Sequence, residues 1–153
     1  MTSGTLLHVH TSAASGRPMV ANESAQAIEG EGIAGDRYAM GKGKYSRSPG
    51  GREVTLFENE TILALKQEHG IELRPQEHRR NLTTEGIRLD DLIGKTFKIG
   101  DVILEGLRSC RPCRYLNVMS KKQVFTHLTD RSGIYARIVS GGTLRCGDEI
   151  DII

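Results

Sequence analysis

Apolar residues along this chain fall into many short runs, and most runs are separated by glycine or by clusters of polar residues. Short apolar runs that alternate with polar residues are typical of β-strands whose two faces have different surroundings. In residues 4–12, GTLLHVHTS, the alternation predicts a first strand with Leu7 and Val9 on one face. Further strands are predicted around residues 20–28, 52–58 and 78–87, on both sides of a Gly100–Asp101 turn in 95–109, and in 133–153 as a strand, a Gly141–Gly142 hairpin and one or two more strands.

A helical period is clearest in residues 58–70, ENETILALKQEHG. Ile62, Leu63 and Leu65 fall within one broad apolar stripe. Acidic residues occupy the first turn, and Gly70 stands where a C-terminal cap is expected. Other segments are predicted to be a single helical turn (89–94), one or two short helices (114–130) and a long, Gly- and Lys-rich loop that is functional or mobile (30–51).

Many short strands with one good helix predict a mainly β domain with a few short helices. The 18 glycines, against no tryptophan and three phenylalanines, agree with a chain that turns often. A closed or partly closed barrel is favoured because closure removes exposed sheet edges. Alternating βαβ units are not visible, so a Rossmann-type sheet is not expected. At 153 residues, we expect a single domain over residues 1–153.

Composition narrows the choice of partners. The net charge of +2 is small and basic residues are interleaved with acidic ones, which argues against a nucleic-acid partner. No apolar run approaches the ~20 residues that a membrane helix needs, and the N-terminal residues lack a signal-peptide pattern. Three cysteines make an odd count, which favours free thiols in a reducing, cytoplasmic compartment.

The segment EGLRSCRPCRYL, residues 105–116, places Cys110 and Cys113 among arginines. A structural zinc site would need a second pair of ligands, and a thioredoxin-type redox pair would need a βαβ fold. Both cysteines could instead be small buried hydrophobic residues. The arginines favour a fourth possibility, because cations lower a thiol pKa and the thiolate is the nucleophile and soft-metal ligand. Cys113, which follows Pro112, is the better candidate for that role, whereas Cys146 is predicted to be structural.

Several arginines stand beside glycines or amides, and they would form an anion pocket if the fold brought them together. The alternative for each is an ordinary solvated surface arginine. No Walker-type loop, HExxH motif or recognisable Ser/His/Asp set is present. The candidates are Arg37 in GDR, Arg52 in GRE, Arg79, Arg80 and Asn81 in HRRN, and Arg137 in YAR.

Taken together, four motifs resemble the MOSC domain, named for the C-terminal domain of molybdenum-cofactor sulfurases. They are GIAGDRY, REVTLFE, RRNLTTEGIRLDDLIGKTFKIGDVILEGLRSCRPCRYL and GIYARIVSGGTLRCGDEI, in order from about residue 20 to the end. The resemblance implies a mainly β, MOSC-like barrel. It also implies that Cys113 ligates the molybdenum of a molybdenum–molybdopterin cofactor, as in the amidoxime-reducing relatives, which reduce N-hydroxylated compounds. Residues like Arg79, Arg80 and Asn81 would face the pterin or its phosphate, and Arg37, Arg52 and Arg137 match further family positions.

In other members of that family the same cysteine has been proposed to carry sulfur as a persulfide. Three hypotheses therefore stay open: a molybdenum-dependent oxidoreductase acting on a small N-oxygenated molecule, a sulfur-carrier module, and a non-catalytic interaction domain. The chain lacks the N-terminal β-barrel, iron–sulfur and pyridoxal-phosphate aminotransferase domains of larger relatives, so pyridoxal phosphate is only an association of the family. An electron donor or sulfur donor would then be another protein. The substrate, the oligomeric state and a Cys110–Cys113 disulfide stay open.

Overall fold

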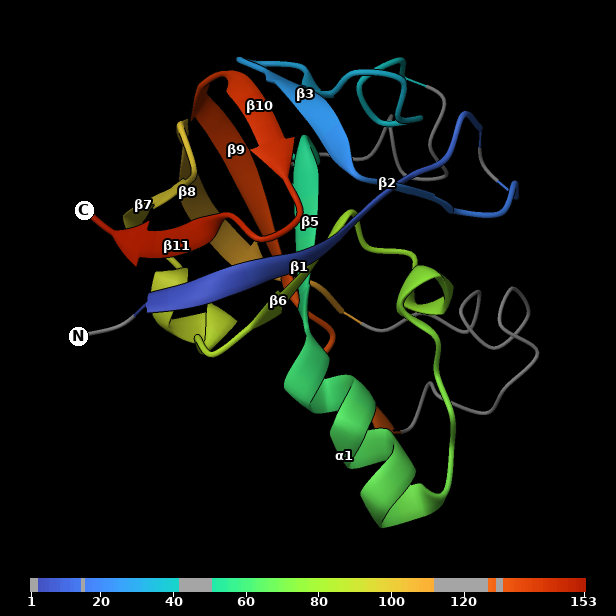
Figure 1. Ribbon diagram of the computed structural model, residues 1–153. Helices are drawn as coiled ribbons and strands as arrows, with labels where there is room; N and C mark the ends of the chain where they lie inside the picture. The colour runs from blue at the N-terminus through green and yellow to red at the C-terminus, as the bar shows by residue number, and fades with distance from the viewer. Residues whose placement is uncertain (1–2, 15, 42–50, 112–126, 129–130) are drawn as a thin grey trace.

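The computed structural model describes residues 3–14, 16–41, 51–111, 127–128 and 131–153 (Figure 1). In that part of the chain, seven strands close into a barrel in the order β11-β7-β8-β9-β5-β6-β1, and β1 pairs with β11 to complete the ring. The prediction of a mainly β fold with a closed barrel is confirmed. The barrel strands are β1 (Ser3–Thr11), β5 (Val54–Glu58), β6 (Leu82–Glu85), β7 (Thr96–Ile99), β8 (Val102–Ser109), β9 (Ile134–Ser140) and β11 (Glu149–Ile152).

A second, three-stranded sheet packs near one end of the barrel, with β3 and β10 side by side at the top of Figure 1. It consists of β3 (Ser24–Ile28), β4 (Gly32–Ile33) and β10 (Gly142–Arg145). The strand predicted around residues 20–28 is therefore two strands, because β2 (Val20–Asn22) pairs with β1 while β3 pairs with β10. β4 lies within the predicted long loop, of which residues 42–50 fall outside the described residues.

The barrel is filled by apolar side chains from every strand of the ring. Leu6, Leu56, Phe97 and Leu104 are among the residues with no exposed surface. On β1 the prediction that Leu7 and Val9 share a face is wrong, because the pairing of β1 with β6 shifts register between Leu6 and His8. Such a bulge adds one residue to the strand, so Leu6 and Val9 are buried while Leu7 is only partly covered.

Helix α1 (Asn59–His69) connects β5 to β6 and projects from the barrel (Figure 1). Gly70 ends it in the left-handed conformation, with φ 66°, and donates to the Leu65 and Lys66 carbonyls, as predicted. Leu65 packs with Phe57 and Leu73 in a small second core. Leu63 was predicted to belong to the buried apolar stripe of this helix, and that part of the prediction is wrong, because its side chain is 50% exposed.

β5 and β6 pair in parallel, with α1 as the connection between them. One βαβ unit is therefore present, although none was predicted. The alternating series of a Rossmann-type sheet is absent from the described residues, where every other strand pair is antiparallel. The sequence did not indicate this βαβ unit because β6 has only four residues and follows a segment without a regular strand pattern.

The C-terminal strands differ from the predicted hairpin. β9 pairs with β8 and β5 in the barrel, whereas β10 pairs with β3 in the second sheet. Gly141 lies between β9 and β10, and a Cβ atom there would lie 2.5 Å from the Ala27 carbonyl oxygen. Gly141 therefore allows the chain to pass closely beside β3 as it changes sheets, instead of turning back on itself.

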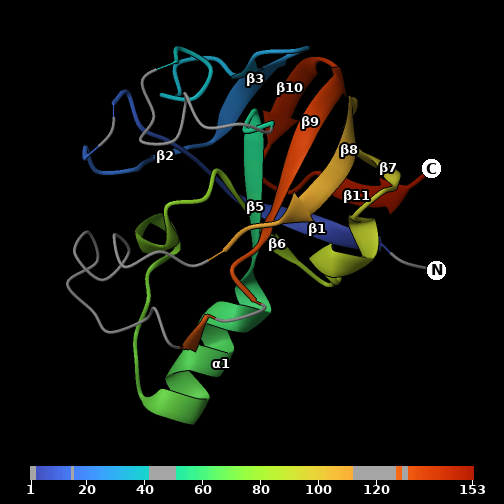
Figure 2. The same cartoon turned by 180° about the vertical axis from the view of Figure 1, so that it is seen from behind.

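Some of the remaining local predictions are confirmed, and others lie outside the described residues. β7 and β8 form the predicted antiparallel pair, seen from behind in Figure 2. The expected helical turn is a 3-10 turn, η2 (Leu89–Leu92), and a second one, η1 (Pro75–His78), precedes β6. The short helices predicted in residues 114–130 lie almost entirely outside the described residues. No helix among the described residues is long and apolar enough to cross a membrane.

Candidate functional site

A buried ion pair fixes the first arginine of the candidate site. Asp36 has no exposed surface; its carboxylate accepts hydrogen bonds from the Ser12 and Tyr38 N–H groups at 3.0 and 3.2 Å. The same carboxylate lies 3.2 Å from Nη1 of Arg37, whose side chain is 8% exposed. Because a buried guanidinium keeps its charge, Asp36 both neutralises Arg37 and sets its direction.

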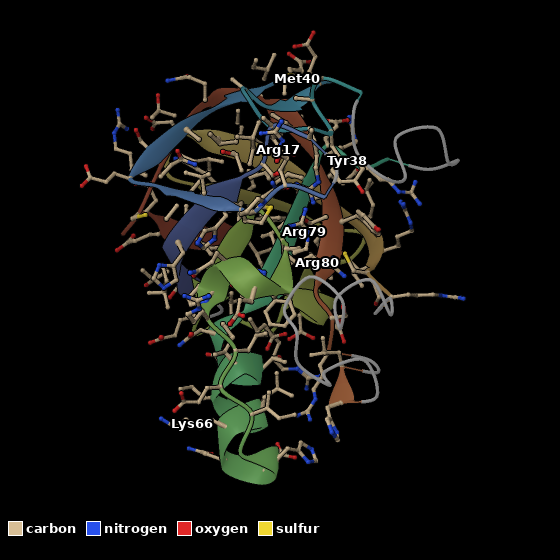
Figure 3. The ribbon with its side chains drawn as sticks, turned by 90° about the vertical axis from the view of Figure 1, so that its right-hand side faces the viewer. Arg17, Tyr38, Met40, Lys66, Arg79 and Arg80 are labelled. Carbon is tan, nitrogen blue, oxygen red and sulfur yellow. The ribbon has the colours of Figure 1, made fainter. Side chains whose placement is uncertain are left out.

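Arg79 lies directly beside Arg37. Nη2 of Arg37 donates to the Arg79 carbonyl oxygen at 3.4 Å, and Nη1 of Arg79 donates to the Arg17 carbonyl oxygen at 2.8 Å. Arg79 is 5% exposed and ends η1 with φ 62°, the left-handed region that arginine rarely adopts. Figure 3 shows Arg17, Tyr38, Arg79 and Arg80 on one face of the molecule. A buried arginine held in a costly backbone conformation points to a functional position.

A small pocket opens beside Arg79. Its volume is about 230 Å³, which is below the ~300 Å³ of ordinary small-molecule pockets. The size suits one group of a ligand, such as a phosphate, better than a whole cofactor. The lining residues are Pro18, Met19, Arg74, Gln76, Glu77 and Arg79.

Arg80 points to a different region from Arg79. Its Nε and Nη2 donate to the carbonyl oxygen and the hydroxyl of Ser132 at 3.1 and 3.0 Å, and Nη2 also reaches the Arg111 carbonyl oxygen at 3.4 Å. Arg111 and Ser132 flank the segment that contains Cys113 in the sequence. One guanidinium therefore ties together the two ends of the cysteine-bearing segment.

Asn81 is buried, and its side chain is used by the fold. Oδ1 accepts from the Thr55 N–H at 3.1 Å and from the Thr55 hydroxyl at 3.2 Å. Nδ2 donates to the His10 carbonyl oxygen at 3.1 Å. The amide thus joins three strand segments, β1, β5 and the start of β6, and sets the position of the two arginines that precede it.

Two buried histidines, His78 and His10, hydrogen-bond to the segment that carries Arg80 and Asn81. Nδ1 of His78 accepts the Arg80 N–H at 2.9 Å, so the neutral ring carries its proton on Nε2, 2.7 Å from the Thr83 hydroxyl. Burial lowers the pKa of His78 well below its usual range, and His10 lowers it further. Burial also lowers the pKa of His10 to about 4, with a smaller effect of His8.

Cys110 directly follows the last residue of β8. It is 3% exposed, and its N–H donates to the Gly133 carbonyl oxygen at 2.8 Å. Burial raises the pKa of the Cys110 thiol, although the guanidinium groups of Arg80, Arg108 and Arg52 act in the opposite direction. A buried, neutral thiol at this position is a poor nucleophile at neutral pH.

Arg52 lies close enough to Cys110 to act on its thiol, whereas Arg137 pairs with Glu105 on the barrel wall. The Arg52 guanidinium carbon lies 5.4 Å from the centre of the Tyr135 ring. Arg137 is on β9 and pairs with Glu105 of β8 at 2.7 Å on an exposed part of the barrel wall. Its partner raises the pKa of Arg137.

Comparison with known proteins decides the family. The profile of the MOSC domain matches residues 29–151, which is most of the chain. The chain belongs to the MOSC family. No sequence among curated proteins matches it.

Solved structures show the same MOSC-type fold. The YuaD protein from Bacillus subtilis superimposes with a TM-score of 0.81 at 15% identity, covering 98% of this chain and 95% of that one. YiiM from Geobacillus stearothermophilus gives a TM-score of 0.71 at 14% identity, covering 98% and 75%. YiiM from Escherichia coli gives 0.68 at 16% identity, covering 97% and 69%. At these identities the likeness concerns the fold alone.

The predicted catalytic and metal-binding residue of this MOSC domain, Cys113, lies outside the described residues. Within the described ranges, no group of three or more His, Cys, Asp or Glu side chains could hold a metal ion. The described cysteines are Cys110, which is buried, and Cys146, which is exposed, and both are free. The position of the Cys113 sulfur relative to the arginines therefore stays a prediction.

Sequence reasoning missed several residues that shape the site of this MOSC domain. Asp36 stood in the motif GDR, where only its arginine was considered. An acid next to an arginine in an otherwise cationic loop was an available signal for a buried pair. Ser132 and Tyr135 gave no local signal, because their partners Arg80 and Cys110 are distant in the sequence.

Proposed function

We propose that this MOSC domain binds a molybdenum–molybdopterin cofactor, with Arg37 and Arg79 beside its anionic group and Cys113 as the thiolate ligand of the metal. The observation that supports this most is the contact between Arg37 and Arg79. The Arg37 guanidinium donates to the backbone carbonyl oxygen of Arg79, 42 positions away in the sequence, and Arg79 lines the adjacent pocket. Arginine forks match phosphate oxygens bidentately, as a phosphate-bearing pterin requires.

The donor chemistry of the described residues fits this group. Buried arginines suit a phosphate, whereas the described histidines and acids form no hard-metal site. A thiophilic metal needs a thiolate, and Cys110 is the less suitable cysteine because its side chain is buried and burial raises its thiol pKa. Cys113 is then the cysteine of the pair that remains for this role.

The chain's own residues would orient the site. Arg80 bridges Ser132 and the Arg111 carbonyl oxygen, and so fixes the ends of the segment that carries Cys113. Asn81 holds Arg80 in place through its bonds to Thr55 and His10. The bound cofactor would supply the two-electron reduction of a small N-oxygenated substrate. A separate electron-donor protein in a reducing, cytoplasmic setting would deliver the electrons.

Metal content tests this proposal directly. Protein isolated from a host that makes the cofactor is expected to contain about one molybdenum per chain by mass spectrometry of the metal, since one cysteine supplies the ligand. Cys113→Ser is expected to lose the metal. Arg79→Gln should reduce the cofactor content, and Arg145→Gln, a matched change at an exposed position of β10, should leave it unchanged. Equal molybdenum in the Cys113→Ser variant would overturn the proposal.

A sulfur-carrier role is the second candidate. The guanidinium groups around Cys110, at the start of the cysteine segment, favour sulfur anions electrostatically, and a persulfide is such an anion. After incubation with a cysteine desulfurase, this role predicts a mass increase of one sulfur atom that Cys113→Ser abolishes. Molybdenum-free protein that gains the sulfur would favour the carrier, while molybdenum-free protein that gains none would exclude it.

A further inference from the structure

Arg108 and Tyr135 face each other across two barrel strands. They are paired positions in the β8–β9 ladder, next to a register shift between Gly106 and Arg108. The Arg108 guanidinium carbon lies 4.3 Å from the centre of the Tyr135 ring, and that of Arg52 lies 5.4 Å from the same ring. The aromatic ring therefore carries two cations, each within the ~6 Å at which a cation–π contact is favourable.

The Arg108 side chain is incompletely satisfied. Its Nη2 atom is buried and has no hydrogen-bond partner in the part of the chain that the structure describes. In that same part, no carboxylate forms an ion pair with it. A buried guanidinium nitrogen without an acceptor costs stability, and an anion that supplies the acceptor would recover it.

The electrostatic surroundings of Arg108 also favour an anion at this position. The guanidinium groups of Arg80, Arg108 and Arg52, and the Tyr135 side chain, all act to lower the pKa of the Cys110 thiol against the effect of burial. These three cations gather around two groups, a thiol and a phenol, whose pKa values burial raises. Neither group is then an anion at neutral pH. Clustered positive charge of this kind attracts a small anion.

We propose that Arg52, Arg108 and Tyr135 form a binding site for a small oxyanion, such as a phosphate, sulfate or carboxylate group. Arg108 Nη2 donates to one oxygen, the Arg52 guanidinium adds charge, and the Tyr135 ring holds the Arg108 guanidinium in position. This site is separate from the pocket beside Arg79. It does not depend on whether the domain carries the molybdenum cofactor.

Titration of the cofactor-free protein tests the site. Phosphate, sulfate and benzoate are added separately at constant ionic strength, adjusted with potassium chloride. Binding is followed by tyrosine fluorescence, which is suitable because the chain has four tyrosines and no tryptophan. The expected result is saturable binding of at least one of the three anions. The anion that binds most tightly then distinguishes a phosphate or sulfate site from a carboxylate site.

Matched variants assign the binding to these residues. Arg108→Gln is expected to weaken the binding of the anion about tenfold or more, the usual effect of losing a charge-assisted hydrogen bond. Arg145→Gln removes the same charge from an exposed position and should bind as the wild type does. Arg79→Gln, which changes the separate pocket, should keep the anion binding that Arg108→Gln weakens. Circular dichroism checks the fold, and Arg108→Lys replaces Arg108→Gln if that variant unfolds, with the same direction expected.

Three outcomes would overturn the inference. One is no saturable binding of any of the three anions. Another is unchanged binding in the Arg108 variant. The third is loss of binding in Arg79→Gln with retention in the Arg108 variant, which would move the anion to the pocket beside Arg79. Molybdenum content plays no part in these readouts, so the cofactor proposal stands or fails separately.

Discussion

The carboxamide of Asn81 and the hydroxyl of Thr55 hydrogen-bond to each other and to each other's backbone. Asn81 Oδ1 accepts from the Thr55 N–H and hydroxyl, and Thr55 Oγ1 lies 3.1 Å from the Asn81 N–H. These contacts fasten β5 to the segment that carries Arg79 and Arg80. In a family whose cofactor is expected to meet these arginines, Asn81 is therefore placed to hold them in position.

Asn81→Ala is expected to destabilise the protein by about 3 kcal/mol, because Thr55 and the His10 carbonyl would lose buried hydrogen-bond partners. The measurement is urea unfolding followed by circular dichroism. Asn59→Ala, which removes an exposed bond to Glu85, should cost less than about 1 kcal/mol. Equal losses in the two variants would contradict the role given to Asn81.

Asp36→Ala should lower the free energy of unfolding by about 3 kcal/mol or more, because it leaves the Arg37 charge buried without its partner. The Ser12 and Tyr38 N–H groups would also lose their acceptor. Thermal unfolding by calorimetry would check this. The double variant Asp36→Ala/Arg37→Met should be more stable than Asp36→Ala alone, and a further loss instead would argue against the pair.

His10 predicts a pH dependence of stability. Its pKa is lowered from 6.5 to about 4 in the folded protein, so below pH 6.5 the unfolded chain binds the additional proton. Stability should therefore fall as the pH drops from about 6.5 to about 4, by at most about 3 kcal/mol from this residue. Urea unfolding at several pH values should show a smaller loss in His10→Gln. Part of the loss will persist, because the pKa of His78 is also lowered.

Gly133→Ala is expected to cost about 3 kcal/mol, since a Cβ there would overlap the Leu56 carbonyl oxygen and the backbone has φ 90°. Gly94 has φ 78° with nothing within 4 Å of an added Cβ, so Gly94→Ala should cost only about 1 kcal/mol. Comparing the two unfolding midpoints separates the clash from the backbone effect. Similar midpoints would show that Gly133 is not tightly packed.

Thiol alkylation should separate two of the cysteines. Cys110 is buried and its thiol pKa is raised, whereas Cys146 is exposed. With iodoacetamide at pH 7.5, Cys110 is expected to react at least about tenfold more slowly than Cys146, because the thiolate is the reacting form. Peptide mass spectrometry measures both rates. Faster reaction at Cys110 would contradict its buried, neutral state.

Local patterns predicted much of the fold. The helix from Asn59 to its Gly70 cap and the β7–β8 pair around Gly100 depend on neighbouring residues, so the sequence predicted them well. The barrel followed from the number of short strands and from the cost of exposed edges. The predicted hairpin at Gly141 was wrong because strand pairing depends on which distant strand is available, and β10 pairs with β3.

By itself the sequence determined the strand-rich composition, the helix and the family, because these are encoded in local periodicity and in motifs read along the chain. Only the tertiary structure decided that Arg37 donates to the Arg79 carbonyl oxygen and that Arg80 bonds both Ser132 and the Arg111 carbonyl oxygen. It also decided that Arg108 pairs with Tyr135 across two strands. The physical reason is that a side chain's partners are set by strand register and by burial. Both are properties of the closed barrel and not of any single segment.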